Sequence, residues 1–446
     1  MIKPLVQDDI VALATPSGIG AIAVIRISGQ NLISLFKKIT RSKGNPKPRY
    51  SNYKTIYNTN DKAIDNCLIT YFNGPNSFTG EDVLEISSHG GDFIPKSILN
   101  MLYGEKVRQA APGEFSYRAF INGKIDLIQA ESISGIISAK TSINADVQLN
   151  NLNGFFSRSI NDIKNKTLYL LTILEHELDF SEEEIDFTKE ETIMNLLKSI
   201  SSKIENILKS SSFGSTINAG IKVVLCGKPN AGKSSLFNRL SGSDRAIVTN
   251  IAGTTRDTIE AWMEISGIPV CLIDTAGLNE TNDLIESIGI ERTKKEIINS
   301  DILLVLDEKN PAKIYKQNNI KNLNKDAILI HTKSDLRSPS KNNNKNINIS
   351  IKNNDGIELL YTELSTVLKK HLGYDYSNDP VIMSRRQKHL LEKGKSILKD
   401  AMTCKEDMII ISSLLREFIE TLEELLGEIG NDDVFNNLFS SFCIGK

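Results

Sequence analysis

The fold of this chain is decided by one stretch of sequence, IKVVLCGKPNAGKS, which spans residues 221–234. Its first six residues are a short apolar run rich in β-branched side chains, which predicts a buried strand. The next eight match the pattern G-x-x-x-x-G-K-[ST] in full. Glycines in such a loop let backbone N–H groups curl round phosphate oxygens, and the following helix presents its positive end to them. The stretch therefore predicts a strand, a phosphate-binding loop and a helix.

The sequence pattern on both sides of this stretch shows how it is built into the chain. From residue 221 to about 372, strands and helices alternate, which predicts a doubly wound, mostly parallel sheet. Apolar residues at helical spacing fill residues 155–214 and about 381–430. Residues 1 to about 120 look α+β, with strands predicted at 21–27 and 82–86. Helices on both sides of an α/β unit indicate a helical domain interrupted by an insertion.

These patterns predict a multidomain α/β protein with boundaries that can be stated. We expect an N-terminal α+β domain over residues 1–122 and the first part of a helical domain over 123–216. An inserted Ras-like P-loop G domain follows over 217–374, and the second part of the helical domain over 375–446. The serine-rich run at 210–215 is interpreted as a linker.

Composition narrows the class of protein. The chain has 446 residues, which suits two or three domains, and its 40% apolar and 24% charged residues are ordinary for a globular protein. The formal net charge of −2 excludes a global positive field, so a nucleic-acid substrate would need a local patch or a partner protein. The five cysteines form no Cys-x-x-Cys pair, which argues against a zinc ribbon or redox dithiol and suits a reducing cytosol. We expect no signal peptide and no membrane span.

Three further motifs follow the phosphate-binding loop in order. The run GTTRD at 253–257 offers Thr255 to complete Mg²⁺ coordination beside Ser234. A predicted strand then ends in DTAG at 274–277, where Asp274 fits a water-mediated Mg²⁺ carboxylate and the Gly277 N–H can sense a γ-phosphate.

The last motif is TKSD at 332–335, and it selects the base. Asp335 can accept both N–H groups on the guanine edge, which adenine does not offer, so GTP is expected rather than ATP. The usual asparagine of this motif is replaced by Thr332, which removes contacts and bears on affinity more than on base choice. The closing loop is Ser350-Ile351-Lys352, whose backbone N–H at Ile351 is placed to touch guanine O6.

The complete predicted site is a guanine-nucleotide site with Lys233 as the residue that reaches the β- and γ-phosphates. The residues expected to bind GTP are Asn230, Ala231, Gly232, Lys233, Ser234, Ser235, Thr249, Asn250, Ile251, Ala252, Gly253, Thr254, Thr255, Asp274, Thr275, Ala276, Gly277, Thr332, Lys333, Asp335, Ser350, Ile351 and Lys352.

Together these residues resemble the bacterial tRNA modification GTPase family called MnmE or TrmE, and the resemblance covers the whole chain. The specific part lies outside the G domain. It consists of the N-terminal segments ATPSG at 14–18, RISG at 26–29, NSFTGED at 76–82 and APGEFS at 111–116, and the terminus SSFCIGK at 440–446.

The resemblance implies a specific activity. Members of the family are cytoplasmic homodimers joined through the N-terminal domain, and they form a heterotetramer with the flavoprotein MnmG. Together the two proteins add a carboxymethylaminomethyl group to C5 of the wobble uridine, position 34, of certain tRNAs. A reduced folate, 5-formyl- or methylene-tetrahydrofolate, binds near the N-terminal dimer interface, and potassium and pairing of G domains stimulate GTP hydrolysis.

The resemblance also implies residue roles. Arg26, Glu85, Lys124 and Lys446 match folate-contacting positions, although each is also readable as an ordinary surface charge. Leu278 stands where many small GTPases have the glutamine that positions the attacking water, and leucine cannot hydrogen-bond, so another residue must do this work. Glu286 matches the family's catalytic glutamate. The alternative is that Glu286 only opens a helix. The residues that match the potassium site are Asn230, Thr249, Ile251 and Thr254.

Two interpretations stay open at this point. Cys443 is readable as a nucleophile for uridine C6 or as a free terminal thiol. The whole chain is readable as a tRNA-modifying enzyme or as a GTP-gated RNA-binding assembly factor of the Era-like class. The second would predict a basic C-terminal RNA-binding module, whereas the helical C-terminus here is acidic, so the first is favoured.

Overall fold

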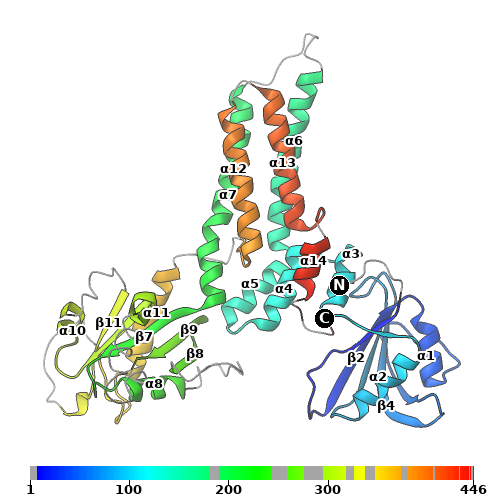
Figure 1. Ribbon diagram of the computed structural model, residues 1–446, viewed down its shortest axis with the longest axis horizontal. Coiled ribbons are helices and arrows are strands. Elements are labelled where there is room, and N and C mark those ends of the chain that lie inside the picture. The colour runs from blue at the N-terminus through cyan, green and yellow to red at the C-terminus, as the bar shows by residue number, and fades with distance from the viewer. Residues whose placement is uncertain are drawn as a thin grey trace. The chain divides into compact units, whose positions relative to one another are not determined.

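A computed structural model describes residues 8–179, 190–243, 259–275, 295–317, 326–336, 347–372, 380–404, 407–430, 432–440, 442 and 445. It divides into two compact units. The first contains residues 1–134, 151–197 and 396–446, and the second contains 135–150 and 198–395. Figure 1 labels the elements of both units.

The first unit is built on a six-stranded sheet of order β3-β4-β5-β2-β1-β6. Neighbouring strands are antiparallel, except that β1 and β6 are parallel. The strands are β1 (Ile10–Leu13), β2 (Ile22–Gly29), β3 (Ser51–Tyr57), β4 (Ala63–Phe72), β5 (Asp82–His89) and β6 (Arg108–Gln109). Alternate residues such as Ile25 and Ile27 are fully buried, on a core shared with helices α1 (Leu32–Thr40) and α2 (Ile94–Gly104). The predicted α+β pattern of this region is therefore confirmed.

The remaining helices of the first unit include α3 (Glu114–Ile121), α4 (Leu127–Ser138), α6 (Phe155–Asp179), α13 (Met408–Leu426) and α14 (Asp432–Ser440). Two pairs of them are in contact, α6 with α13 and α3 with α14. Figure 1 shows α6 and α13 side by side, and the Lys164–Glu423 ion pair joins them at 2.9 Å. Phe439 of α14 lies in an aromatic cluster with Tyr117 and Phe120 of α3.

Two long helices, α7 (Glu190–Ala219) and α12 (Arg385–Thr403), contribute residues to both units. The linker predicted at 210–215 is wrong, because these residues continue α7. Their hydroxyls hydrogen-bond back to the preceding turn, as Ser210 does to the Ile207 carbonyl at 2.7 Å. Gly214 is needed for close packing, since a Cβ there would lie 1.9 Å from the Ile382 carbonyl oxygen. The ends of the α/β insertion meet here, where Asn218 donates to the Met383 carbonyl at 2.8 Å.

The second unit contains the predicted α/β fold. Its six-stranded sheet has the order β12-β11-β10-β7-β9-β8, and all neighbours are parallel except β8 with β9. The elements are α5 (Ser142–Leu152), β7 (Ile221–Gly227), α8 (Lys233–Ser241), β8 (Ile259–Ile265), β9 (Ile268–Asp274), β10 (Ile302–Asp307), α10 (Pro311–Gln317), β11 (Asp326–His331), β12 (Ile347–Asn348) and α11 (Ile357–Leu372). This mostly parallel, doubly wound sheet confirms the predicted fold class, while the predicted domain boundaries stay a prediction.

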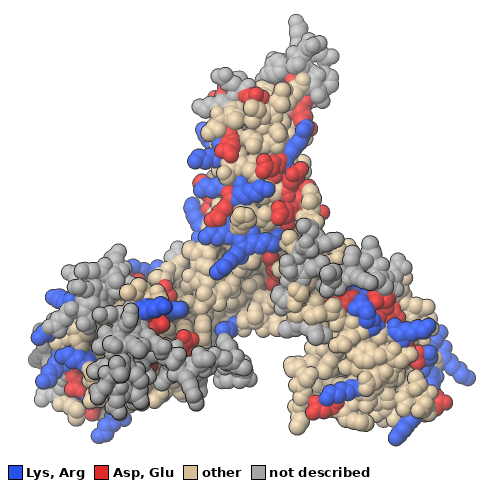
Figure 2. Space-filling model, viewed as in Figure 1, with Lys and Arg blue, Asp and Glu red and all other residues tan. Residues whose placement is uncertain are grey.

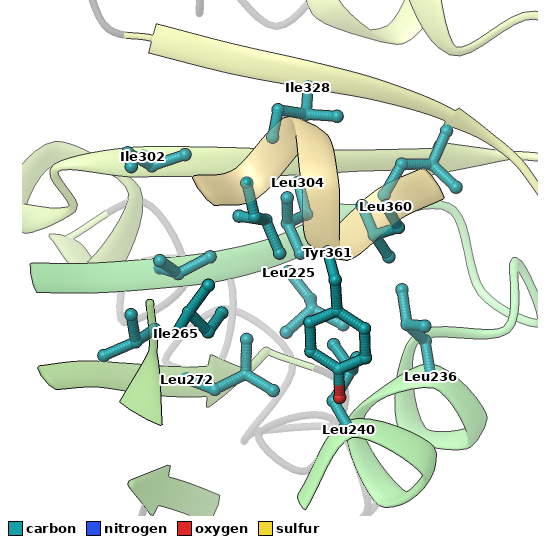
Figure 3. Close-up of a cluster of buried hydrophobic side chains, with 14 of the residues drawn as sticks. Leu225, Leu236, Leu240, Ile265, Leu272, Ile302, Leu304, Ile328, Leu360 and Tyr361 are labelled. Atoms are coloured by element: carbon teal, nitrogen blue, oxygen red, sulfur yellow. The ribbon is translucent and has the colours of Figure 1, made fainter. Parts of the chain in front are cut away.

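Buried side chains hold this sheet between its helices. Figure 3 shows Leu225, Leu272 and Leu304 of the sheet meeting Leu236 of α8 and Leu360 of α11. Within the described residues, no helix is both long and apolar enough to cross a membrane. On the face seen in Figure 2, acidic and basic side chains are intermixed, in keeping with the formal net charge of −2.

Candidate nucleotide-binding site

The phosphate-binding loop has the backbone that its glycines predict. It joins β7 to α8, and the N-cap of α8 is Gly232, with φ 90°. Gly227 has φ 159° and approaches β10 so closely that a Cβ would lie 2.3 Å from the Leu306 carbonyl oxygen. Asn230 has φ 62°, in the left-handed region that asparagine tolerates better than most residues. The loop therefore turns its backbone toward the N-terminus of α8, where N–H groups and the helix dipole favour an anion.

The side chain of Lys233, the lysine of the G-x-x-x-x-G-K-[ST] pattern, lies inside this loop. Lys233 is only 6% exposed, and its ammonium donates to the Gly227 carbonyl at 3.0 Å and to the Lys228 carbonyl at 2.9 Å. Burial lowers the pKa of Lys233, while the nearby Asp274 carboxylate acts in the opposite direction. The chain thus holds a positive charge within the curl of the loop, where it can pair with phosphate.

The predicted Mg²⁺ carboxylate lies beside the loop. Asp274 ends β9 and pairs with Leu225 of β7, the strand that leads into the loop. Thr275 donates its hydroxyl to the Leu225 carbonyl at 2.8 Å, which fixes the start of the DTAG motif there. Ser234 and Ser235 are exposed in the first turn of α8. A hydroxyl and a carboxylate are oxygen ligands of the kind Mg²⁺ prefers, so this donor set fits that ion.

The residues predicted to read guanine come together from two loops. Asp335 lies on a short 3-10 helix at Ser334–Leu336, and it accepts a hydrogen bond from the Ser350 hydroxyl at 2.7 Å. That hydrogen bond lowers the pKa of Asp335, so the group is a carboxylate acceptor. The backbone N–H of Ser334 donates to the Ile349 carbonyl at 3.1 Å. The TKSD motif and the 350–352 loop are thereby joined, as a guanine site requires.

Thr332 marks the departure from the usual motif. It is 1% exposed, its N–H donates to the Asp307 carbonyl at 3.2 Å, and Gly232 lies next to it. Its hydroxyl is buried with no hydrogen-bond partner among the described residues. A buried polar group left unsatisfied is unfavourable, and the effect of this substitution on nucleotide affinity stays a prediction.

Many predicted site residues lie outside the described residues. They are Thr249, Asn250, Ile251, Ala252, Gly253, Thr254, Thr255, Ala276, Gly277, Glu286, Cys443 and Lys446. Their roles stay predictions. Among the residues that are described, no group of three or more His, Cys, Asp or Glu side chains is placed to hold a metal ion.

The positions assigned to folate by resemblance lie on the sheet of the first unit. Arg26 and Glu85 face each other across β2 and β5, with Arg26 Nε 2.9 Å from Glu85 Oε1. The Arg26 guanidinium also donates to the Gly445 carbonyl at 3.3 Å. Lys124 is exposed and lies beside Gly80. The structure thus brings Arg26, Glu85 and Gly445 together.

Sequence reasoning missed the aromatic part of this region. The rings of Phe78 and Phe115 each lie 5.9 Å from the Arg26 guanidinium. Both belong to motif segments that support the family resemblance, but no local pattern indicated that they would meet over Arg26. Phe115 is fully buried and Phe78 is exposed, so a guanidinium, a carboxylate and one ring are the groups offered to a ligand with an acidic tail and a flat heterocycle.

Comparison with known proteins places the chain in a family. Residues 127–443 match the family described as MnmE helical domain, and residues 9–124 match the one described as GTP-binding protein TrmE N-terminus. A tRNA modification GTPase MnmE of Aquifex aeolicus is 38% identical, over 99% of this chain and 100% of that protein. The protein of the same name from Francisella philomiragia is 39% identical over 99% of each.

One solved structure is also similar in part. The G domain of the T. maritima FeoB iron transporter matches 33% of this chain and 98% of its own, with 25% identity and a TM-score of 0.27, which is too low to add to the argument. The full-length matches and the two family models are sufficient: this chain belongs to the MnmE (TrmE) family of tRNA modification GTPases.

Proposed function

We propose that this chain hydrolyses GTP as part of tRNA modification, and that with the flavoprotein MnmG it adds a carboxymethylaminomethyl group to C5 of the wobble uridine. The observation that carries the proposal is the meeting of a complete phosphate-binding loop with the Asp335–Ser350 base site, in a chain of this family. The protein acts as a cytoplasmic homodimer and assembles with MnmG as a heterotetramer.

In this proposal the chain's own residues bind and orient GTP. Backbone N–H groups of the loop at 228–233 hold the phosphates, and Lys233 places its charge on the β- and γ-phosphate oxygens. Asp335 accepts from the guanine edge. Ser234 and Thr255 hold Mg²⁺ directly and Asp274 holds it through water. The ion neutralises charge on the phosphates when bound.

Two further residues serve hydrolysis in the proposal. Asn230, with its unusual φ of 62°, holds K⁺ together with Thr254 and the carbonyls of Thr249 and Ile251. A K⁺ ion there supplies positive charge near the transferred phosphate. Glu286 orients the attacking water. Equal rates in potassium and sodium would remove the first assignment, and an unchanged single-turnover rate in Glu286→Ala would remove the second.

The first unit binds a reduced folate in the proposal, through Arg26, Glu85, Lys124 and Lys446. The Arg26–Glu85 pair beside the exposed Phe78 ring supports this, because it offers charge of both signs next to flat apolar surface. Calorimetric titration with 5-formyl-tetrahydrofolate tests it. Binding should weaken at least about tenfold in Arg26→Ala, the scale of one lost charge-assisted hydrogen bond, and unchanged binding would exclude Arg26.

The function as a whole is tested by analysing modified nucleosides in tRNA from a strain that lacks the gene. Loss of the C5 carboxymethylaminomethyl group, restored by the wild-type gene and not by Lys233→Ala, is the expected result. Normal tRNA nucleosides together with defective ribosome assembly would instead support an RNA-binding assembly factor.

A further inference from the structure

Helix α5 begins on the hairpin formed by β8 and β9. The Glu264 carboxylate of β8 accepts hydrogen bonds from the Ser142 hydroxyl at 2.9 Å and from the Ser142 backbone N–H at 3.3 Å. Ser142 is the first residue of α5, where backbone N–H groups have no partner within the helix and negative charge is favourable. Glu264 therefore caps α5 from a strand more than a hundred residues away in the sequence.

A second contact lies two residues away on the same strand. The ammonium of Lys140 is 4.2 Å from the centre of the Trp262 ring, within the range of a cation–π interaction. The ring also packs against Gly220, where a Cβ would lie 2.5 Å from Trp262. Trp262 thus fills the space between the segment before α5 and the junction of α7 with β7.

The hairpin turn makes a third contact. Gly267 has φ 85°, and a Cβ there would lie 2.6 Å from the Ile143 side chain. In the same first turn of α5, Asn144 donates to the Ile217 carbonyl at 3.3 Å and to the Asn218 side chain at 3.2 Å. The start of α5 is therefore tied both to the hairpin and to the end of α7.

The opposite end of this hairpin is at the nucleotide site. Its strands pair without a break from Ile265–Ile268 at the turn to Ile259–Asp274 at the other end. Seven residues of strand span about 20 Å. Asp274 is the predicted Mg²⁺ carboxylate, and β8 follows the GTTRD motif at 253–257 in the sequence. A shift of Asp274 between the GTP and GDP states would act on one end of an element whose other end contacts α5.

We propose that Glu264 and Trp262 are positioning residues that couple the bound nucleotide to α5. The hairpin carries the difference between the GTP and GDP states to Ser142 and Lys140, and the contact changes between the two states. Because coupling between two sites is reciprocal, the hold of α5 on the hairpin also biases which nucleotide is bound more tightly. This goes beyond the proposed function, since no contact with GTP requires Glu264 or Trp262.

Trp262 is the only tryptophan of the chain, so all tryptophan emission comes from this position on β8. The experiment measures tryptophan emission and affinity of the full-length protein with Mg²⁺ and either GDP or a non-hydrolysable GTP analogue. Wild-type emission should differ between the two nucleotides. In Glu264→Gln this difference should fall by at least half, and the ratio of GTP-analogue to GDP affinity should change at least about fivefold.

Loss of a purely structural contact would lower the affinity for both nucleotides equally. The ratio of GTP-analogue to GDP affinity would then stay unchanged. Glu363→Gln, which neutralises an exposed carboxylate of α11, is the matched control and should retain the wild-type ratio and emission difference. Should Glu264→Gln fail to fold by circular dichroism, Ser142→Ala removes one hydrogen bond and should reduce the emission difference. Identical wild-type emission with both nucleotides, or an unchanged ratio in the folded variant, would overturn the proposal. No measurement involves tRNA, so failure here leaves the proposed function standing.

Discussion

The phosphate-binding loop and the Arg26–Glu85 region are built in opposite ways. The loop comes from the contiguous residues 227–234, and its shape rests on backbone angles and on one buried lysine. The Arg26–Glu85 region combines side chains and backbone that lie 59 and 419 residues apart in the sequence. A site made of backbone needs only a short motif, whereas a site made of paired side chains needs the surrounding structure to hold each partner.

A cluster of charged side chains around Arg118 contacts β2, the strand that carries Arg26. Arg118 is 9% exposed and forms ion pairs with Asp8 at 2.9 Å, with Glu81 at 3.0 Å and with Glu114 at 3.1 Å. Glu81 in turn accepts from the Ser28 hydroxyl at 2.7 Å. This cluster fixes the segment that carries Phe78. Buried polar networks of this kind stabilise only when every member is paired.

The largest expected effect is a loss of GTP hydrolysis in a variant of the phosphate-binding loop that still folds. Lys233→Ala should reduce GTP hydrolysis by about 10²–10³-fold or more, because it removes a preorganised charge from the transferred phosphate. Single-turnover hydrolysis measures this, and circular dichroism should show an unchanged fold. Lys228→Ala is the control, since that side chain is exposed and only its backbone carbonyl contacts Lys233. A rate equal to that of the control would refute the assignment.

The next effect breaks the charged cluster and leaves nucleotide binding intact. Glu114→Gln should lower the free energy of unfolding of the first unit by about 1.5–3 kcal/mol, because it weakens charge-assisted hydrogen bonds from Arg108 and Arg118 to a buried carboxylate. Urea unfolding followed by circular dichroism should show the loss, while Trp262 emission, which reports on the second unit, should not shift. Asp61→Asn, in an ion pair whose carboxylate is 83% exposed, should cost under about 1 kcal/mol.

Acid should produce the same loss in the wild type. Burial by itself raises the pKa of Glu114, but hydrogen bonds from Arg108 and from the Ala111 N–H outweigh it, and the pKa lies below its ordinary 4.5. A lowered folded-state pKa gives stability that is present above the unfolded value and is lost as pH falls through the folded one. Unfolding of the first unit should therefore become easier below about pH 4.5, and less so in Glu114→Gln. Equal acid sensitivity of the two proteins would contradict this.

A smaller effect concerns the nucleotide preference of the proposed base site. Asp335→Asn exchanges an acceptor for a donor opposite the guanine edge, so GTP affinity should fall about 10- to 100-fold, the scale of hydrogen bonds to a charged group. Affinity for xanthosine triphosphate should rise. Competition binding with GTP, XTP and ATP measures the preference, and a variant that still selects GTP would show that another group reads the base.

The smallest effect concerns the buried hydroxyl of Thr332. Thr332→Asn supplies an amide that can reach toward the loop beside Gly232, so GTP should bind more tightly by about 1 kcal/mol, roughly fivefold. Thr332→Val, which removes the unpaired hydroxyl and keeps the shape, should be near neutral. Weaker binding in Thr332→Asn would mean that the space beside Gly232 cannot accept the longer side chain.

Part of the molecule was predictable because its signals are local. The apolar strand at 221–226, the glycine pattern after it and the alternation up to 372 predicted the sheet, the loop and the base site. Local signals also misled at 210–215, where serines and a glycine suggest a linker. There Gly214 is required by the Ile382 backbone packed against α7, a partner that lies far along the chain.

The sequence by itself determined the strand, the phosphate-binding loop and the helix that follows, because the shape of that loop depends on neighbouring residues that set their own backbone conformation. It also indicated the family, and it predicted Asp335 as the residue that selects guanine. Only the tertiary structure decided that Arg118 joins three carboxylates, that Phe78 and Phe115 flank Arg26, and that Glu264 caps α5. The physical reason is that an ion pair or a cap needs two groups at hydrogen-bond distance, and folding brings together partners between which the sequence carries no periodic signal.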